Sequence, residues 1–457
     1  MPTLHRPRTI VCLLAVMVWL VPGAVLGAQA RHVILLIGDG MGPGQFGAAR
    51  LYSTKLLGKE LHMAEVMRSG RTAYLANDSA DSVITESAAA ATQIACGVRA
   101  LTGAVGMGPD GKTPCKTLLE IAKDRGLATG LVTTSGITDA TPAAFAAHVR
   151  HRSDEFAVAV QEVGLGVEVL QGGRRQFFLP EAAGGVRMDG KHVIAMAQTA
   201  GYTVVGTAGE LQRAEGPKLL GLYSTGNMSY EIDRAGTAEP SLSEMTAKAF
   251  GILSRNPRGF FAVIEGGRID HAAHRNDAPA TIRDTLAFDE AVGVALEFQT
   301  RSPDTLLIVA ADHETGGMSL IGHRVDGRGD VGMNLELIRN ARASFELMQD
   351  ALGWNPTPEQ IKEVVKQYLA VEITEVEAKA VAADSLHRLD PRSYPYPTLH
   401  TLAFVLRPYL GVGWVSGTHT GSPLMAFGSG PGSGGLVGFR HNTDLFRIMK
   451  AALGGAH

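Results

Sequence analysis

The sequence has little cysteine, little excess charge and few long apolar runs, and each shortage excludes a class of protein. Three cysteines in 457 residues cannot form the disulfide framework of a small secreted domain. A formal net charge of −3 gives no reason to expect a nucleic acid as partner. After residue 30 no apolar run approaches the length of a membrane span. What remains is a globular chain whose hydrophobic content of 45% can build a large core.

The N-terminal 30 residues have the organisation of an export signal. Basic residues precede an apolar run at residues 10 to 26, which contains Pro-Gly and is followed by A-Q-A at residues 28 to 30. An uncleaved membrane anchor is the competing interpretation, because the run is almost long enough to span a bilayer. The helix breakers and the A-x-A ending favour cleavage, so we expect residues 1–30 to be a signal peptide and the mature protein to be periplasmic or secreted, with no stable membrane insertion.

Only Cys96 and Cys115 would remain after cleavage. In an oxidising compartment they could form a disulfide, but two cysteines in so long a chain are not a scaffold. We expect two free thiols. Their spacing does not resemble a cysteine-based metal site.

Buried strands alternate with helical patterns along the chain, which predicts an α/β fold with a mainly parallel central sheet and helices on both faces, a three-layer αβα sandwich. The apolar runs that we interpret as strands include residues 127–134, 259–264 and 304–311. The expected helices cover residues 117–126, 241–253, 280–298 and 443–453, and a further helix is expected to contain residues 148–152.

A tract of different character separates two histidine-containing loops near the C-terminus. Residues 335–387 are charged, alanine-rich and helical in pattern, and residues 388–397 are rich in proline and tyrosine. We expect an inserted helical subdomain over about residues 335–410, serving as a lid or as a subunit contact.

The stretch V-I-E-G-G-R-I-D-H-A-A-H at residues 263–274 places polar side chains where a buried strand ends. If the following segment is helical, Asp270 and His274 lie four residues apart on one face and can bind one ion together. An oxygen and a nitrogen at this spacing suit zinc, whereas a lone carboxylate such as Glu265 suits magnesium. A solvated helix face with ordinary charges explains the stretch equally well.

Two further strands end in polar residues. Asp39 stands between glycines after V-I-L-L-I-G, where a G-x-G-x-x-G motif fails because Pro43 replaces its last glycine. The usual role of such an aspartate is to cap the next helix. The pair Asp312-His313 ends the strand of residues 304–311 and so repeats the position of Asp39.

Ser87 and the pair Asp139 and Thr141 each have an ordinary and a catalytic interpretation. Ser87 opens an alanine-rich helix, where a serine is usually the N-cap but where a nucleophile would also profit from the helix dipole. No G-x-S-x-G elbow accompanies it. Asp139 and Thr141 are hard oxygen donors suited to magnesium, although a turn with an Asx-type hydrogen bond before Pro142 explains them as well.

Together these motifs resemble the alkaline phosphatase family, from about residue 31 to the C-terminus. The similar stretches, in the order of the family, are V-I-L-L-I-G-D-G-M-G, T-E-S-A-A-A-A-T, D-A-T-P-A-A-F-A-A-H, E-G-G-R-I-D-H-A-A-H, A-D-H-E-T-G-G and T-H-T-G. The resemblance implies an enzyme that hydrolyses phosphate monoesters with two zinc ions and one magnesium ion, and it implies a homodimer.

Site residues follow from the resemblance position by position. One zinc would be bound by Asp270, His274 and His419, the other by Asp39, Asp312 and His313 with Ser87 beside it, and magnesium by Asp139, Thr141 and Glu265. Ser87 would be the nucleophile that forms a phosphoseryl intermediate. Arg152 would bind two phosphoryl oxygens through its planar guanidinium.

Two other functions stay open beside this one. A phosphodiesterase with the same two-zinc core is disfavoured by Arg152 and by a complete third site, which both suit a phosphate with two unesterified oxygens. A non-catalytic exported protein that binds phosphate would be expected to lack the nucleophile or the ligands, and all of them are present.

The sequence departs from the family pattern in three places. Glu86 precedes the serine where the family commonly has aspartate. Asp139 resembles the bacterial pattern and His271 the animal pattern, which leaves the occupant of the third metal site open. The third departure is the long insertion.

Overall fold

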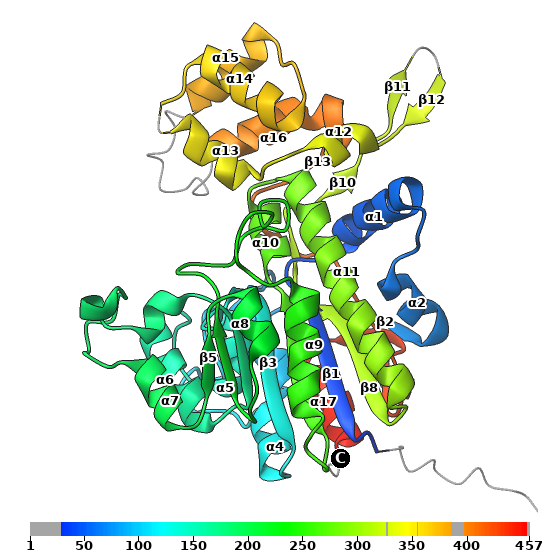
Figure 1. The fold of residues 1–457 in the computed structure, drawn as a ribbon. Coiled ribbons are helices and arrows are strands. Elements are labelled where there is room, and N and C mark those ends of the chain that lie inside the picture. The colour runs from blue at the N-terminus through cyan, green and yellow to red at the C-terminus, as the bar shows by residue number, and fades with distance from the viewer. Residues whose placement is uncertain (1–28, 326–327, 354, 385–396, 455–457) are drawn as a thin grey trace, which may run out of the picture.

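The described residues (29–325, 328–353, 355–384 and 397–454) of the computed structural model form a central sheet with helices on both faces (Figure 1). The sheet consists of β1 (His32–Gly38), β2 (Arg71–Ala76), β3 (Ala128–Gly136), β4 (Val169–Gly173), β5 (Thr203–Val205), β6 (Leu219–Leu222), β7 (Phe260–Gly266), β8 (Thr305–Ala311), β15 (Leu424–Ser429) and β16 (Gly438–His441). In space the order is β16-β2-β15-β8-β1-β7-β3-β4-β6-β5. Among these strands only β15 runs antiparallel to its neighbours.

Helices cover both faces of the sheet, which confirms the predicted αβα sandwich. One face carries α2 (His62–Ser69), α9 (Leu242–Leu253) and α11 (Ala278–Arg301), and the other carries α3 (Ser87–Cys96), α4 (Leu118–Asp124), α5 (Ala140–Ala146) and α17 (Thr443–Ala452). Figure 1 shows α9 and α11 in front of the sheet. Every residue of β1, β7 and β8 is buried, as expected for parallel strands covered on both sides.

The predicted helix around residues 148–152 is wrong. Helix α5 ends at Ala146, because Ala147 adopts an extended conformation and Val149 pairs with Val105 in an isolated bridge. Arg152 therefore lies on a loop.

The expectation of two free thiols is also wrong, because Cys96 and Cys115 form a disulfide. Cys96 is the last residue of α3, and the chain after it folds back until the two Cα atoms are 5.9 Å apart. Such a separation is within the range of a disulfide. The cysteines lie 19 positions apart in sequence, which gave no sign of this proximity.

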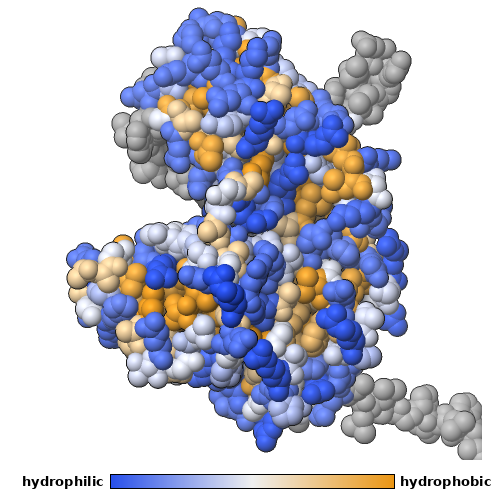
Figure 2. All heavy atoms as spheres, in the orientation of Figure 1, coloured by the Kyte–Doolittle hydropathy of each residue, from blue (hydrophilic) through white to orange (hydrophobic). Residues whose placement is uncertain are grey.

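Five helices near the C-terminus pack around a second hydrophobic cluster. They are α12 (Leu335–Asn340), α13 (Phe345–Leu352), α14 (Pro358–Leu369), α15 (Glu375–Asp384) and α16 (Pro397–Leu410). Tyr52 of α1 (Pro43–Tyr52) and Ile282 of α11 join this cluster. Figure 2 shows a mostly hydrophilic surface on these helices, as expected where apolar residues face a common core. The limits of an inserted subdomain at about 335–410 stay a prediction, and residues 385–396 lie outside the described residues.

The five helices stand over the carboxyl edge of the sheet (Figure 1) and are attached there by polar contacts. Glu346 of α13 forms ion pairs with Arg275 at 2.7 Å and with Arg268 at 3.4 Å. Arg268 is the first residue of α10 (Arg268–His274), and Arg275 directly follows its last residue. The backbone N–H of Phe345 donates to Asp277, which is also the N-cap of α11. The outer helices are thus fastened to the helix that carries Asp270 and His274.

The predicted signal peptide lies almost entirely outside the described residues. Among the residues that are described, no helix combines the length and the apolar character needed to cross a membrane.

Glu162 of α6 (Glu155–Leu165) is buried, and neither of its carboxyl oxygens has a hydrogen-bond partner among the described residues. Burial, together with the charge of Glu155, raises the pKa of Glu162 well above its usual range. The folded protein therefore holds this carboxyl protonated at pH values at which the unfolded chain has ionised it, so stability is lost as the pH rises above the unfolded pKa of about 4.5.

We predict that Glu162→Gln removes this loss. Thermal unfolding at about pH 6 and about pH 9 should show a gain in Tm that is larger at the higher pH, roughly 2 °C or more. The exposed Glu181 provides the matched control Glu181→Gln, which should follow the wild type. Equal pH dependence in Glu162→Gln and the wild type would contradict the prediction.

Candidate metal centre

The polar residues singled out in the sequence meet at the carboxyl edge of three neighbouring strands. Gly38 of β1 pairs with Gly266 of β7 and with Ala311 of β8. Because these strand ends are level, Asp39 and Asp312 directly follow two neighbouring strands, and Glu265 lies beside them in β7, one residue before the strand ends. This is the edge at which open α/β sheets bind their ligands.

Helix α10 brings Asp270 and His274 together as the i, i+4 spacing predicts. His274 Nε2 lies 3.3 Å from Asp270 Oδ2, and the Asp270 side chain is only 6% exposed. A solvated helix face is therefore excluded. Gly40 closes over this pair with φ 68°, and a Cβ on it would stand 2.9 Å from Asp270 Oδ1, so only glycine fits there.

Neither Ser87 nor Asp39 has the capping role that its sequence context suggested. Glu86 is the N-cap of α3, and its carboxylate accepts the N–H groups of Ala88 and Ala89. Gly42 is the N-cap of α1. Ser87 is consequently the first residue of its helix, with its Oγ 3.1 Å from His313 Nε2.

The protonation of two histidines follows from their backbone partners. His274 Nδ1 lies 2.8 Å from the carbonyl of Gly417, and His419 Nδ1 lies 3.0 Å from that of Thr85. Carbonyl oxygens only accept, so each Nδ1 carries the hydrogen and each Nε2 of the neutral ring is left with a lone pair. The two Nε2 atoms are 3.1 Å apart. In neutral rings, two lone pairs in this position repel each other unless a cation lies between them.

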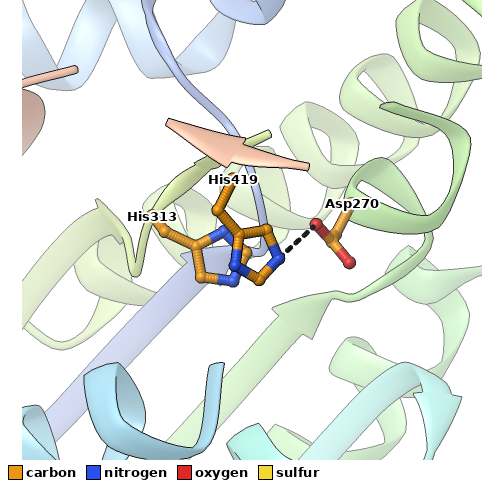
Figure 3. A group of neighbouring side chains, drawn as sticks. All are labelled: Asp270, His313 and His419. Atoms are coloured by element: carbon orange, nitrogen blue, oxygen red, sulfur yellow. Dashed lines mark ion pairs between the residues drawn. The ribbon is translucent and has the colours of Figure 1, made fainter. Parts of the chain in front are cut away.

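His313 is oriented in the same way. The hydroxyl of Thr315 donates to Asp270 Oδ1 and so accepts from His313 Nδ1, at 3.2 Å. The Nε2 of His313 is therefore unprotonated, and it lies 3.3 Å from Asp39 Oδ1 and 3.4 Å from Asp312 Oδ2. Figure 3 shows His313 and His419 side by side, with Asp270 facing His419.

The donor set of the site fits bound cations. Asp39 Oδ1 and Asp312 Oδ2 are buried and have no hydrogen-bond donor among the described residues. Two groups have ligand atoms within 4.8 Å of one another: Asp270, His313 and His419, and Asp39, Asp312 and His313. His274 lies beside the first group through its contacts with Asp270 and His419. Carboxylate oxygens and imidazole lone pairs that outnumber the donors around them are a metal-binding arrangement.

Burial dominates the acid–base behaviour of the carboxylates. It raises the pKa of Asp39 well above its usual range, and the charge of Asp312 adds to the effect. Burial and the charge of Asp270 raise the pKa of Asp312 to about 8. Burial would raise the pKa of Asp270, but the hydrogen bond and charge of His274, together with His313 and His419, bring this pKa well below its usual range. Protons must therefore leave Asp39 and Asp312 before a cation can bind them.

Arg152 reaches the same cavity from its loop. Its guanidinium donates to Glu86 Oε2 at 2.9 Å and to Asp139 Oδ1 at 2.8 Å. The cavity has a volume of about 440 Å³ and is lined by Ser87, Arg152, Asp270, His271, His274, Thr418 and His419. A serine hydroxyl and a guanidinium thus face the same space as the metal-ligand candidates.

The three residues predicted to bind magnesium differ in how far they are already paired. Thr141 Oγ1 is buried without a hydrogen-bond partner among the described residues. Glu265 accepts the hydroxyl of Thr133, and burial raises its pKa to about 7. Asp139, by contrast, has both oxygens paired with arginines, Oδ1 with Arg152 and Oδ2 with Arg174 at 3.0 Å.

Sequence reasoning missed several residues that support the site. Thr315 orients both Asp270 and His313. Glu314 accepts the N–H of Gly317 and the hydroxyl of Thr420, and so joins β9 (Glu314–Thr315) to β14 (His419–Thr420), which pair as antiparallel strands. The position of Glu314 and Thr315 directly after His313 was the available signal. Arg174 had none.

The sheet is mainly parallel, and a buried cluster of carboxylates and imidazoles lies at its carboxyl edge beside a serine and an arginine. This combination defines a metal-dependent hydrolase. The alkaline phosphatase family model matches residues 30–454. The chain belongs to the alkaline phosphatase family and is an enzyme of that family.

Individual relatives agree with this assignment. The chain is 32% identical over 438 residues to alkaline phosphatase 4 of Bacillus subtilis, covering 93% of this chain and 89% of that protein. It is 38% identical over 350 residues to the repressible alkaline phosphatase of Saccharomyces cerevisiae, covering 68% of this chain and 60% of the yeast protein. The crystal structure of Thermus thermophilus alkaline phosphatase superposes with a TM-score of 0.86 at 36% identity, covering 94% of this chain and 93% of that one.

The raised pKa values of Asp39 and Asp312 predict that metal affinity depends on pH. Ligand carboxylates must be deprotonated, so the apparent zinc affinity should rise by about tenfold per pH unit for each proton released. Chelator competition between about pH 6 and about pH 8 measures this slope, which should be shallower in Asp312→Asn, a variant that cannot release that proton. A pH-independent affinity in the wild-type protein would contradict the prediction.

Proposed function

We propose that this protein hydrolyses phosphate monoesters to an alcohol and inorganic phosphate through a phosphoseryl intermediate on Ser87. The observation that carries the proposal is the position of Ser87 Oγ. It lies at the N-terminus of α3, 3.1 Å from His313 Nε2, and shares a cavity with Arg152. The nucleophile, an anion-binding guanidinium and the metal-ligand candidates therefore surround one space large enough for a phosphoryl group.

The ligand chemistry supports two zinc ions and one magnesium ion. Asp270, His274 and His419 would bind one zinc and Asp39, Asp312 and His313 the other, because mixed carboxylate and imidazole donors suit zinc. Asp139, Thr141 and Glu265 supply only oxygens, which suit magnesium. When bound, the zinc ions lower the pKa of the Ser87 hydroxyl and stabilise negative charge on the leaving oxygen.

The residues of the chain have defined tasks in the reaction. Ser87 attacks phosphorus in line with the departing alcohol, and the α3 N-terminus favours the negative charge on its oxygen. Arg152 donates to two phosphoryl oxygens, for which its planar fork is suited. Glu86 and Asp139 hold that fork in place. Water then attacks the phosphoseryl group from the side the alcohol left, which releases phosphate and restores Ser87.

Two other functions are kept as outcomes of the test. A two-zinc phosphodiesterase would use the same metals, but its diester substrate has only two unesterified oxygens, one fewer than a monoester, to share between Arg152 and the metal ions. A non-catalytic phosphate-binding protein would not need a serine 3.1 Å from a metal-ligand candidate. The geometry favours neither over the monoesterase.

The same proposal includes export and pairing of two subunits. The Cys96–Cys115 disulfide supports an oxidising compartment, in agreement with a signal peptide at residues 1–30. A homodimer is proposed from the family resemblance. N-terminal sequencing of the secreted protein and light scattering of the purified protein test these two points.

The decisive assay compares an aryl phosphate monoester with the matching diester on protein resupplied with zinc and magnesium. Ser87→Ala should lower kcat at least about a thousandfold and leave the zinc content unchanged. Ser241→Ala is the matched control, because Ser241 also stands at a helix N-terminus, as the N-cap of α9, but has no place in the site.

Two other results of this assay would change the assignment. Faster turnover of the diester would move the assignment to the phosphodiesterase. No turnover of either ester by fully metallated protein would support the phosphate-binding protein.

A further inference from the structure

Arg174 has an unusual backbone conformation at the edge of the site. It follows β4 with φ 62° and ψ 39°, and it is one of three non-glycine residues with positive φ among the described part of the chain. The left-handed region is unfavourable for a residue with a Cβ. Such a conformation persists where surrounding contacts hold it, so the contacts of the side chain are informative.

The path of the Arg174 side chain depends on a glycine at the end of β3. A Cβ on Gly136 would stand 2.1 Å from Arg174 Cδ and 2.3 Å from Cγ. Any other residue at position 136 would displace the arginine. The missing side chain at Gly136 thus leaves the space that the Arg174 side chain occupies on its way to Asp139.

Three acceptors fix the guanidinium of Arg174. Its Nε donates to Asn227 Oδ1 at 3.1 Å, its Nη1 pairs with Glu155 Oε2 at 2.9 Å, and its Nη2 pairs with Asp139 Oδ2 at 3.0 Å. Each of the three guanidinium nitrogens thus has its own acceptor. A lysine could not meet all three, because its ammonium is a single point charge.

Arg174 is the fourth member of a row of alternating charges. The row runs Glu86, Arg152, Asp139, Arg174, Glu155, with neighbours joined at 2.8–3.0 Å. The Asp139 side chain is 9% exposed and that of Arg174 is 19% exposed. When one partner of a buried ion pair is removed, the other is left as an uncompensated charge and tends to move. Without Arg174, Asp139 would face Glu155 with no cation between them.

Resting on the proposed function, we propose that Arg174 is a positioning residue for phosphate binding. It holds one oxygen of Asp139, so that the other oxygen holds the Arg152 guanidinium in the cavity beside Ser87. Arg174 acts on the substrate only through Asp139 and Arg152. Its removal should therefore weaken phosphate binding by releasing Arg152, and it should matter little once Arg152 is gone.

The test uses the mature enzyme saturated with zinc and magnesium, and inorganic phosphate as the probe. Arg174→Gln should raise the inhibition constant of phosphate and the KM of an aryl phosphate by about tenfold, with a smaller change in kcat. Arg174→Lys keeps the positive charge but loses the planar guanidinium, so its inhibition constant and KM should lie between those of the wild type and Arg174→Gln. Arg175→Gln, which removes the neighbouring guanidinium outside the row of ion pairs, is the matched control and should behave like the wild type.

A double-mutant cycle separates positioning from general structural damage. In the Arg152→Ala background, Arg174→Gln should change the phosphate inhibition constant less than about twofold. A full additional loss in that background would overturn the proposal, and so would a wild-type inhibition constant in Arg174→Gln. Should Arg174→Gln fail to fold, Arg174→Lys decides by the same measurement. If the wild-type enzyme shows no turnover, the affinity for phosphate is measured by calorimetry in place of the inhibition constant. The role of Arg174 is then tested even if the proposed function is wrong.

Discussion

The site depends on one constraint: more hydrogen-bond acceptors are buried together than the surrounding donors can satisfy. The Nε2 atoms of His274, His313 and His419 all point inward, because a backbone carbonyl or Thr315 occupies each Nδ1. They meet carboxylates, and among these Asp39 Oδ1 and Asp312 Oδ2 have no hydrogen-bond partner among the described residues. Such a cluster is unfavourable until positive charge enters it, so the fold and the metal ions have to be considered together.

Much of this arrangement is predictable from the sequence, because it depends on the positions of residues within single strands and helices. Polar residues at the ends of buried strands must lie near one another when the strands are parallel neighbours, and Asp39, Glu265 and Asp312 stand at the ends of β1, β7 and β8. The i, i+4 spacing of Asp270 and His274 predicted a shared helix face, and α10 provides it. The αβα sandwich followed from the alternation of strands and helices.

What could not be predicted depends on contacts between segments distant in sequence. The disulfide requires the loop after α3 to return to the helix end, and the loop at residues 148–152 forms because Val149 pairs with Val105. Glu86 rather than Ser87 caps α3, since the longer acid reaches two N–H groups at once. The role of Arg174 depends on a left-handed backbone and on Gly136, which no spacing rule reveals. Attachment of the outer helices through Glu346 likewise joins α13 to arginines far earlier in the chain.

We propose that the acceptor cluster binds two cations. Crystals of the zinc-loaded protein measured on both sides of the zinc absorption edge test it most directly. We expect two anomalous peaks, one among Asp270, His274 and His419 and one among Asp39, Asp312 and His313. A single peak in the cluster, or zinc bound only elsewhere on the protein, would contradict the claim.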